Sequence, residues 1–291
     1  MIVALALVVG FLAGRLAWMT LHRTFDQDLF QRANVRGVMV PTACGLIVVV
    51  AALVVEGARV LAGGLGLGSR ITESGPRLGV LMVALAMGVA GLLDDIAGSG
   101  HARGFRGHVG EMVRGRLTTG GVKLVTGVAV AFVAVAAARP DASRSIGQLW
   151  GDAALVALAA NLGNLLDRAP GRAGKAGLAV FLVLMIATLA DPALSGVAVV
   201  VGASAALLHD DIKERAMLGD TGANVLGGVL GLGVVIACSP GVRLVTLVVV
   251  LALNLVSEVV SFSRVIDAVP PLRYLDRAGR AGPSGRAASA G

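Results

Sequence analysis

The chain has 291 residues, of which 56% are hydrophobic and 15% are charged, and it carries a formal net charge of +7. Soluble domains carry about 25% charged residues, so this composition, with a mean hydropathy of +0.84, excludes an ordinary soluble protein. The apolar residues come in long runs, which predicts an all-α fold, a polytopic membrane helical bundle.

Nine apolar runs follow one another along the chain, and we expect each of them to form a transmembrane helix. They cover residues 2–20, 39–62, 78–93, 121–138, 148–166, 177–190, 193–208, 222–237 and 243–262. The first run has no basic residue ahead of its apolar core and no clear cleavage site. We therefore interpret it as a retained helix and not as a signal peptide.

The connecting segments indicate the orientation of these helices. One of two alternating sets carries most of the 25 lysine and arginine residues, and it comprises residues 21–38, 94–120, 167–176, 209–221 and 263–291. Because basic loops stay on the cytoplasmic side, we predict a multi-pass protein of the cell membrane with its N-terminus outside and its C-terminus inside. Topology then explains the positive charge, and nucleic acid is not expected as a partner.

These patterns predict one integral membrane domain over residues 1–280. Residues 281–291 are small and polar, which is typical of a disordered cytoplasmic tail. Cys44 and Cys238 would lie near opposite faces of the membrane, so we expect no disulfide.

The first polar constellation is the pair Asp94 and Asp95, which follows the uncharged run 78–93. Two carboxylates at the C-terminal end of a helix oppose its dipole, at a cost of up to about 1 kcal/mol each. A solvated helix end is one explanation. A Mg²⁺ site or a catalytic base is the other, because a divalent cation would remove the repulsion.

Two further constellations suit phosphate chemistry. Asp220 lies in MLGDTGANVLGG, residues 217–228, just before an apolar helix. It is either an N-cap or part of a phosphate site that uses the free backbone N–H groups of that helix. Lys123 begins the run 121–138, where it either extends to the membrane interface or supplies a point charge for phosphate.

Asn161, Asn164 and Asp167 recur at every third residue, which places them on roughly one face of a helix. Such a polar stripe is costly against lipid, so it predicts a polar cavity. Amide and carboxylate groups there could recognise the edge of a base or of a sugar. Hydrogen bonding between helices is the alternative explanation.

Taken in chain order, these motifs resemble the bacterial polyprenyl-phosphate N-acetylhexosamine-1-phosphate transferase superfamily, which includes phospho-N-acetylmuramoyl-pentapeptide transferase. The resemblance runs from about residue 36 to residue 235. It is carried by RGVMVPTACG (36–45), LLDDIAG (92–98), GGVK (120–123), NLGNLLD (161–167) and MLGDTGANVLGG (217–228).

This resemblance implies Mg²⁺-dependent transfer of a sugar-1-phosphate from a nucleotide sugar, of the UDP type, to a polyprenyl phosphate. The reaction would occur at the cytoplasmic face, release UMP and serve cell-envelope polysaccharide synthesis. Asp94, Asp95 and Asp220 would be catalytic, and Asp220 and Asp95 would hold the metal. The residues implied to bind substrate are Lys123, Asn161, Asn164 and Asp167.

The chain also departs from the family pattern. Residues 265–280 lack the histidines of the family's last cytoplasmic loop, and no apolar run follows as a tenth helix. Met217 stands where an aromatic residue is usual, and Arg168 stands where glycine is common. An inactive paralogue that binds the lipid carrier or an envelope-synthesis partner is therefore the alternative, and a homodimer is one assembly we consider. A secondary transporter is less favoured, because the acids gather at one face and not at the midplane.

Overall fold

The computed structural model describes residues 1–34, 36–67, 74–97, 119–140 and 144–280, and their side chains except for residues 74 and 119–124. Over these residues the chain forms eleven α-helices and one two-stranded hairpin. The all-α prediction is confirmed. The predicted tail at 281–291 lies outside the described residues.

Seven helices of the described chain are long and apolar enough to cross a membrane, as in a multi-pass membrane protein. They are α1 (Ile2–Leu21), α2 (Leu46–Gly64), α3 (Ser74–Ala97), α6 (Ile146–Leu166), α8 (Ser195–Ile212), α9 (Gly219–Ala237) and α10 (Pro240–Ser257). The remaining two predicted runs lie in α5 (Thr119–Ala138) and α7 (Arg172–Ala187). Over the described residues, α5 has a shorter apolar part and α7 has only 16 residues. The nine-span topology therefore stays a prediction.

The smaller elements all lie between or after these helices. They are the 3₁₀ turns η1 (His22–Asp26), η2 (Asp28–Phe30) and η3 (Pro192–Leu194), the strands β1 (Gln31–Ala33) and β2 (Met39–Pro41), and the C-terminal helices α11 (Phe262–Ala268) and α12 (Pro270–Arg277). The two strands pair antiparallel, with Arg32 opposite Val40.

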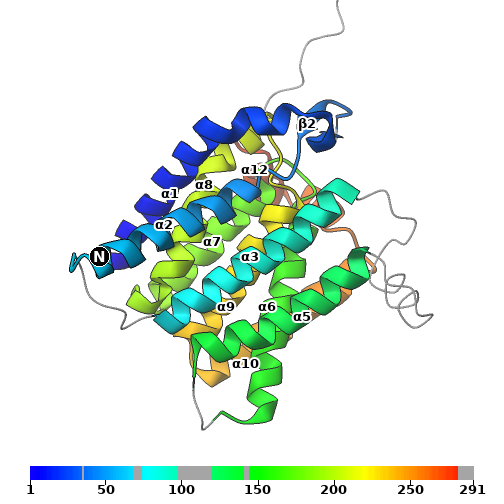
Figure 1. The fold of residues 1–291 in the computed structure, drawn as a ribbon. Helices are drawn as coiled ribbons and strands as arrows, with labels where there is room; N and C mark the ends of the chain where they lie inside the picture. The colour runs from blue at the N-terminus through cyan, green and yellow to red at the C-terminus, as the bar shows by residue number, and fades with distance from the viewer. Residues whose placement is uncertain (35, 68–73, 98–118, 141–143, 281–291) are drawn as a thin grey trace, which may run out of the picture.

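The centre of the bundle is formed by α8 and α9, which are buried along most of their length. Helix α1 packs along α8, α6 packs along α9, and α3 contacts both α5 and α9. Helices α1 and α2 lie on one side of this centre, and α5 and α10 lie on the other (Figure 1). The central helices are rich in glycine, alanine and valine, which lets neighbouring backbones approach closely.

Three boundaries differ from the predicted runs. The run 39–62 begins as strand β2, because a residue before proline, here Val40, disfavours helix. Helix α3 continues through Asp94 and Asp95 to Ala97, so the two acids belong to its last turn. Helix α8 continues to Ile212, so the acids at 210 and 211, expected in a loop, are helical.

The C-terminal residues also fold where we predicted no helix. Pro270 begins α12 in the first helical position, which proline favours because it has no backbone N–H to leave unpaired. Figure 1 places α12 at the end of the bundle that carries the hairpin.

Candidate functional site

The candidate site lies at one end of the bundle, here called the inner end. Helices α3, α6 and α8 finish there, and helices α7 and α9 begin there. Most of the acids singled out in the sequence lie at these helix ends, so the topology brings segments far apart in the chain together. The opposite end, where α6 and α10 begin, is called the outer end.

Asp95 caps the first turn of α9. Its Oδ1 accepts the backbone N–H of Asp220 at 3.0 Å, and its Oδ2 accepts the backbone N–H of Thr221 at 3.0 Å and the Thr221 hydroxyl at 2.6 Å. The N–H groups at a helix start have no intrahelical partner and carry partial positive charge. The unfavourable position of Asp95 at the end of one helix is therefore offset by the beginning of another.

Two glycines permit this close approach. Gly219 has a φ of +72°, and a Cβ there would lie 2.6 Å from Oδ2 of Asp95. A Cβ at Gly91 on α3 would lie 2.4 Å from the backbone oxygen of Asp220. Both contacts are shorter than real Cβ atoms allow, so larger residues would push α3 and α9 apart.

Asp220 is held between α6 and α9. Its Oδ2 accepts the side-chain amide of Asn164 at 3.0 Å, and its backbone oxygen accepts the amide of Asn224 at 2.6 Å. The N-cap interpretation of Asp220 is wrong, because Leu218 is the N-cap and Asp95 accepts the helix-start N–H groups. The side chain of Asp220 is thus directed to Asn164, one of the predicted substrate-binding residues.

Asp167 follows the last residue of α6 and faces the same group of acids. Burial raises the pKa of Asp167 well above its usual value, and neighbouring carboxylates raise it further. Those neighbours are Asp211, Asp220 and Asp95. A backbone hydrogen bond from Gly219 offsets part of the rise. Asp167 therefore lies within range of the charges of the other three carboxylates, and these four side chains are here called the carboxylate cluster.

A pocket of about 150 Å³ opens beside the carboxylate cluster. Its polar lining includes Asp167 and Asp211 together with Asn34, Arg168 and Glu214. The pocket joins the end of α6, the end of α8 and the hairpin, so a bound polar molecule would contact all three.

The hairpin contribution to this pocket was not predicted. Glu214 forms an ion pair with Arg36 and accepts the amide of Asn34 at 2.6 Å. Glu214 has a φ of +55°, in a turn directly after α8. The two arginines of residues 32–36 and the three acids of residues 209–217 are a weak signal in the sequence that these segments meet, because residues 209–217 also carry two basic residues.

The other predicted site residues, Asn161, Asp94 and Lys123, are not members of the carboxylate cluster. Asn161 donates to Oδ1 of Asn254 on α10 at 2.7 Å, so it joins two helices about one turn further into the bundle. Asp94 is half-buried in the last turn of α3. Lys123 lies in α5, and its side chain is outside the part of the chain that the structure describes.

The cluster is compatible with a Mg²⁺ ion that arrives with its substrate. Among the described residues, no group of three or more His, Cys, Asp or Glu side chains is arranged to hold a metal ion. Mg²⁺ needs only one or two protein carboxylates when phosphate oxygens and water complete its shell. Burial, and after it the charges of the neighbouring carboxylates, raise the pKa of Asp167, and a cation bound here would relieve both.

No protein-family model and no curated protein matched this chain. The resemblance to the polyprenyl-phosphate sugar-phosphate transferases therefore rests on the order and spacing of the motifs alone.

Proposed function

We propose that this protein is a membrane phosphoglycosyltransferase. It transfers a sugar-1-phosphate from a nucleotide sugar, of the UDP type, to a polyprenyl phosphate at the cytoplasmic face of the cell membrane, for envelope polysaccharide synthesis. The proposal includes nine membrane spans, with the N-terminus outside and the inner end of the bundle in the cytoplasm. The observation that carries it is the carboxylate cluster at one end of an apolar bundle.

The charge of the cluster supports phosphoryl chemistry. Burying carboxylates beside one another is unfavourable unless a cation compensates them. A substrate that carries two phosphates and Mg²⁺ into this site would supply that cation. When bound, Mg²⁺ would neutralise phosphate charge as the reaction proceeds.

The reaction we propose is a displacement at phosphorus. An oxygen of the lipid phosphate forms a bond to the β-phosphorus of the nucleotide sugar, and the bond from that phosphorus to the bridging oxygen breaks. UMP leaves with the bridging oxygen, and the products are UMP and a polyprenyl-diphosphate sugar. Such reactions depend mainly on positioning and charge neutralisation.

Each residue then has a role in this reaction. Asp220, fixed by Asn164, is the main metal ligand. A carboxylate has about four acceptor positions, and Asp95 uses three of them to hold the start of α9. One position therefore remains for the metal. Asp94 orients the lipid phosphate.

The donor would bind along the end of α6. Asn164, which donates to Asp220, and Asp167, a member of the carboxylate cluster, contact the nucleotide. Asn161 keeps α10 against this wall through Asn254. Lys123 supplies positive charge for the donor phosphates.

The alternative is an inactive paralogue that binds the lipid carrier or an envelope-synthesis partner without turnover. Two observations favour it. Residues 265–280 contain no histidine, and Asp95 is largely occupied by hydrogen bonds within the fold.

The deciding experiment uses the purified full chain in lipid nanodiscs with polyprenyl phosphate, Mg²⁺ and a panel of nucleotide sugars. Release of UMP and formation of the lipid-linked sugar are measured. We expect turnover with at least one UDP-sugar, and Asp220→Asn should reduce it about 100-fold or more, as losses of charge-stabilising groups do. Asp267→Asn, at an exposed ion pair far along the chain, is the matched control.

Two outcomes would count against the proposal. Turnover that survives Asp220→Asn would refute the role of the cluster. Binding of polyprenyl phosphate without release of any nucleotide across the panel would favour the inactive paralogue.

A further inference from the structure

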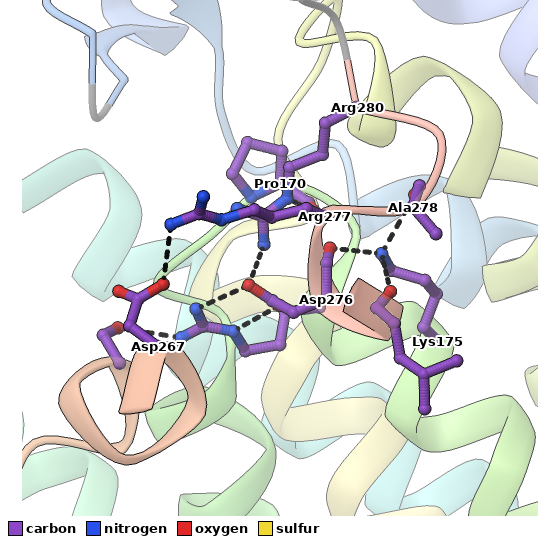
Figure 2. Close-up of polar contacts among 10 residues, drawn as sticks. Pro170, Lys175, Asp267, Asp276, Arg277, Ala278 and Arg280 are labelled. Atoms are coloured by element: carbon purple, nitrogen blue, oxygen red, sulfur yellow. Dashed lines mark hydrogen bonds and ion pairs between the residues drawn. The ribbon is translucent and has the colours of Figure 1, made fainter. Parts of the chain in front are cut away.

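The C-terminal strap, residues 262–280, packs against the start of α7 through a dense set of polar contacts (Figure 2). The strap comprises α11, α12 and the three residues that follow them. The candidate site and the proposed function use none of these contacts, so the strap needs an explanation of its own.

The strongest contact is a buried two-pronged ion pair between the strap and α7. Arg172 donates from Nε to Oδ1 of Asp276 at 2.8 Å and from Nη2 to Oδ2 at 3.1 Å. The two residues are only 7% and 8% exposed. The same guanidinium donates from Nη1 to the hydroxyl of Ser263 at 2.9 Å, so one side chain holds both strap helices. Paired hydrogen bonds of this kind fix geometry as well as adding energy.

A lysine closes the end of α12. Nζ of Lys175 donates to the backbone oxygens of Leu275, Asp276 and Ala278 at 2.9, 2.5 and 3.2 Å. The last carbonyls of a helix have no intrahelical partner and carry partial negative charge. Lys213, just after α8, donates to the backbone oxygen of Gly279 at 2.9 Å.

Arg280 connects the strap to the loop 167–171. Its Nε donates to the backbone oxygen of Pro170 at 3.2 Å, and its Nη2 lies 2.6 Å from Oδ2 of Asp276. Figure 2 shows Asp276 between Arg280 and Lys175, with Pro170 beside Arg280. Asp276 therefore orders one arginine from α7 and one arginine from the strap.

The loop 167–171 has the carboxylate cluster on its other side. It begins with Asp167, and the backbone N–H of Gly171 hydrogen-bonds Asp211. Asp167, Ala169 and Pro170 all line the 150 Å³ pocket. One face of the loop thus contacts the strap, and the other face contacts the pocket.

The charges agree with this placement. Although burial opposes it, the hydrogen bonds and charge of Arg172, with Arg280 and Lys175, lower the pKa of Asp276. The carboxyl group of Asp276 therefore favours its anionic form, which the ion pair with Arg172 requires.

We propose that Asp276 is a positioning residue for the nucleotide-sugar donor. By fixing Arg172 and Arg280 it holds the loop 167–171, and hence Asp167, at the wall of the pocket. The inference rests on the proposed function for its donor, and it predicts an effect on the donor and none on the lipid acceptor.

The test compares Asp276→Asn with Asp267→Asn in the full chain in nanodiscs. Asp267 is a matched control, because it forms an ion pair with Arg277 in the same strap but both side chains are exposed. Hydrogen–deuterium exchange of residues 167–175 is measured first, and it requires no activity. We expect exchange there to accelerate about tenfold or more in Asp276→Asn and to be unchanged in Asp267→Asn.

Steady-state kinetics then separate positioning from general stability. Asp276→Asn should raise KM for the UDP-sugar about tenfold, with kcat and KM for polyprenyl phosphate within about twofold of the parent, the pattern of lost binding alone. Asp276→Glu, which keeps the charge, should restore part of the donor KM.

The outcomes are distinct. Unchanged exchange at 167–175 overturns the positioning role, whether or not the protein is an enzyme. Equal changes in KM for the donor and for the acceptor would mean that the strap only stabilises the fold, and they would also overturn the positioning role. If exchange is faster in Asp276→Asn but the parent protein shows no turnover, the strap still holds the loop, and only the proposed function and the donor role that depends on it are refuted. If Asp276→Asn does not fold, Arg280→Gln, which leaves the buried pair intact, is held to the same expectations.

Discussion

Helix α6 has an aspartate near each end, and the two are treated differently. Asp152, at the outer end, is buried and pairs with Arg243 on α10, while Arg144 lies 3.7 Å away. Asp167, just past the inner end, faces three further carboxylates and a backbone N–H. The same residue type is thus neutralised by arginine at one end and crowded by like charges at the other.

This difference distinguishes an acid that serves the stability of the fold from one that is available to bind a ligand. A buried carboxylate paired with arginine has its charge cancelled within the fold, and removing either partner leaves an uncompensated charge. A carboxylate held among like charges is stabilised only when it takes up a proton, which is why its pKa rises, or when a cation binds beside it. The inner end is therefore where a charged ligand would gain most by binding.

The largest expected effect is at the outer end. Asp152→Ala should lower the free energy of unfolding by about 3–5 kcal/mol, because it leaves Arg243 buried without its counter-charge. Denaturant unfolding in mixed micelles measures this. The double variant Asp152→Ala with Arg243→Leu should recover most of the loss, and if it does not, the pair is not what stabilises this end.

An intermediate effect is expected where the inner end is assembled. Gly219→Ala should cost about 1–3 kcal/mol, because alanine is strained at positive φ and its Cβ would meet the Asp95 carboxylate. Thermal unfolding in detergent provides the measurement. Gly57→Ala is the control, since a Cβ there meets nothing within 4 Å, and a loss as large at that position would contradict the explanation.

The smallest expected effect concerns pH and Mg²⁺ at the inner end. Because the folded-state pKa of Asp167 is raised, its ionisation opposes folding. Its contribution to stability is full below the ordinary carboxyl pKa of about 4 and is lost as the pH rises through the folded-state pKa. Asp167→Asn should remove that dependence.

Mg²⁺ should oppose the same loss at neutral pH. At ten times its Kd it would raise the free energy of unfolding by about 1.4 kcal/mol. Thermal unfolding across a pH series, with and without Mg²⁺, measures both effects. Equal stabilisation by Mg²⁺ in the parent and in Asp220→Asn would argue against a metal at the cluster.

Much of the candidate site was predictable, because its residues are polar within apolar surroundings. Asp95, Asp167 and Asp220 are conspicuous beside uncharged runs, and the structure brings them together with Asn164. The ion pair between Glu214 and Arg36 of the hairpin was not predictable, since an ion pair between two distant segments leaves no periodic pattern in the sequence. The strap was missed because α11 and α12 are short, with seven and eight residues, and their positions depend on contacts with α7.

Hydropathy alone determined that this chain forms long apolar helices with acids grouped between them, because burial in an apolar phase acts on each segment locally. Only the tertiary structure decided what each acid does. Asp95 could end α3 because α9, 125 residues further on, presents its free N–H groups at that point. Asp276 could be buried because Arg172, 104 residues earlier in the chain, donates hydrogen bonds to its carboxylate. Whether a carboxylate is neutralised within the fold or is available to a ligand depends on its partners. Those partners are set by tertiary packing and not by the neighbouring sequence.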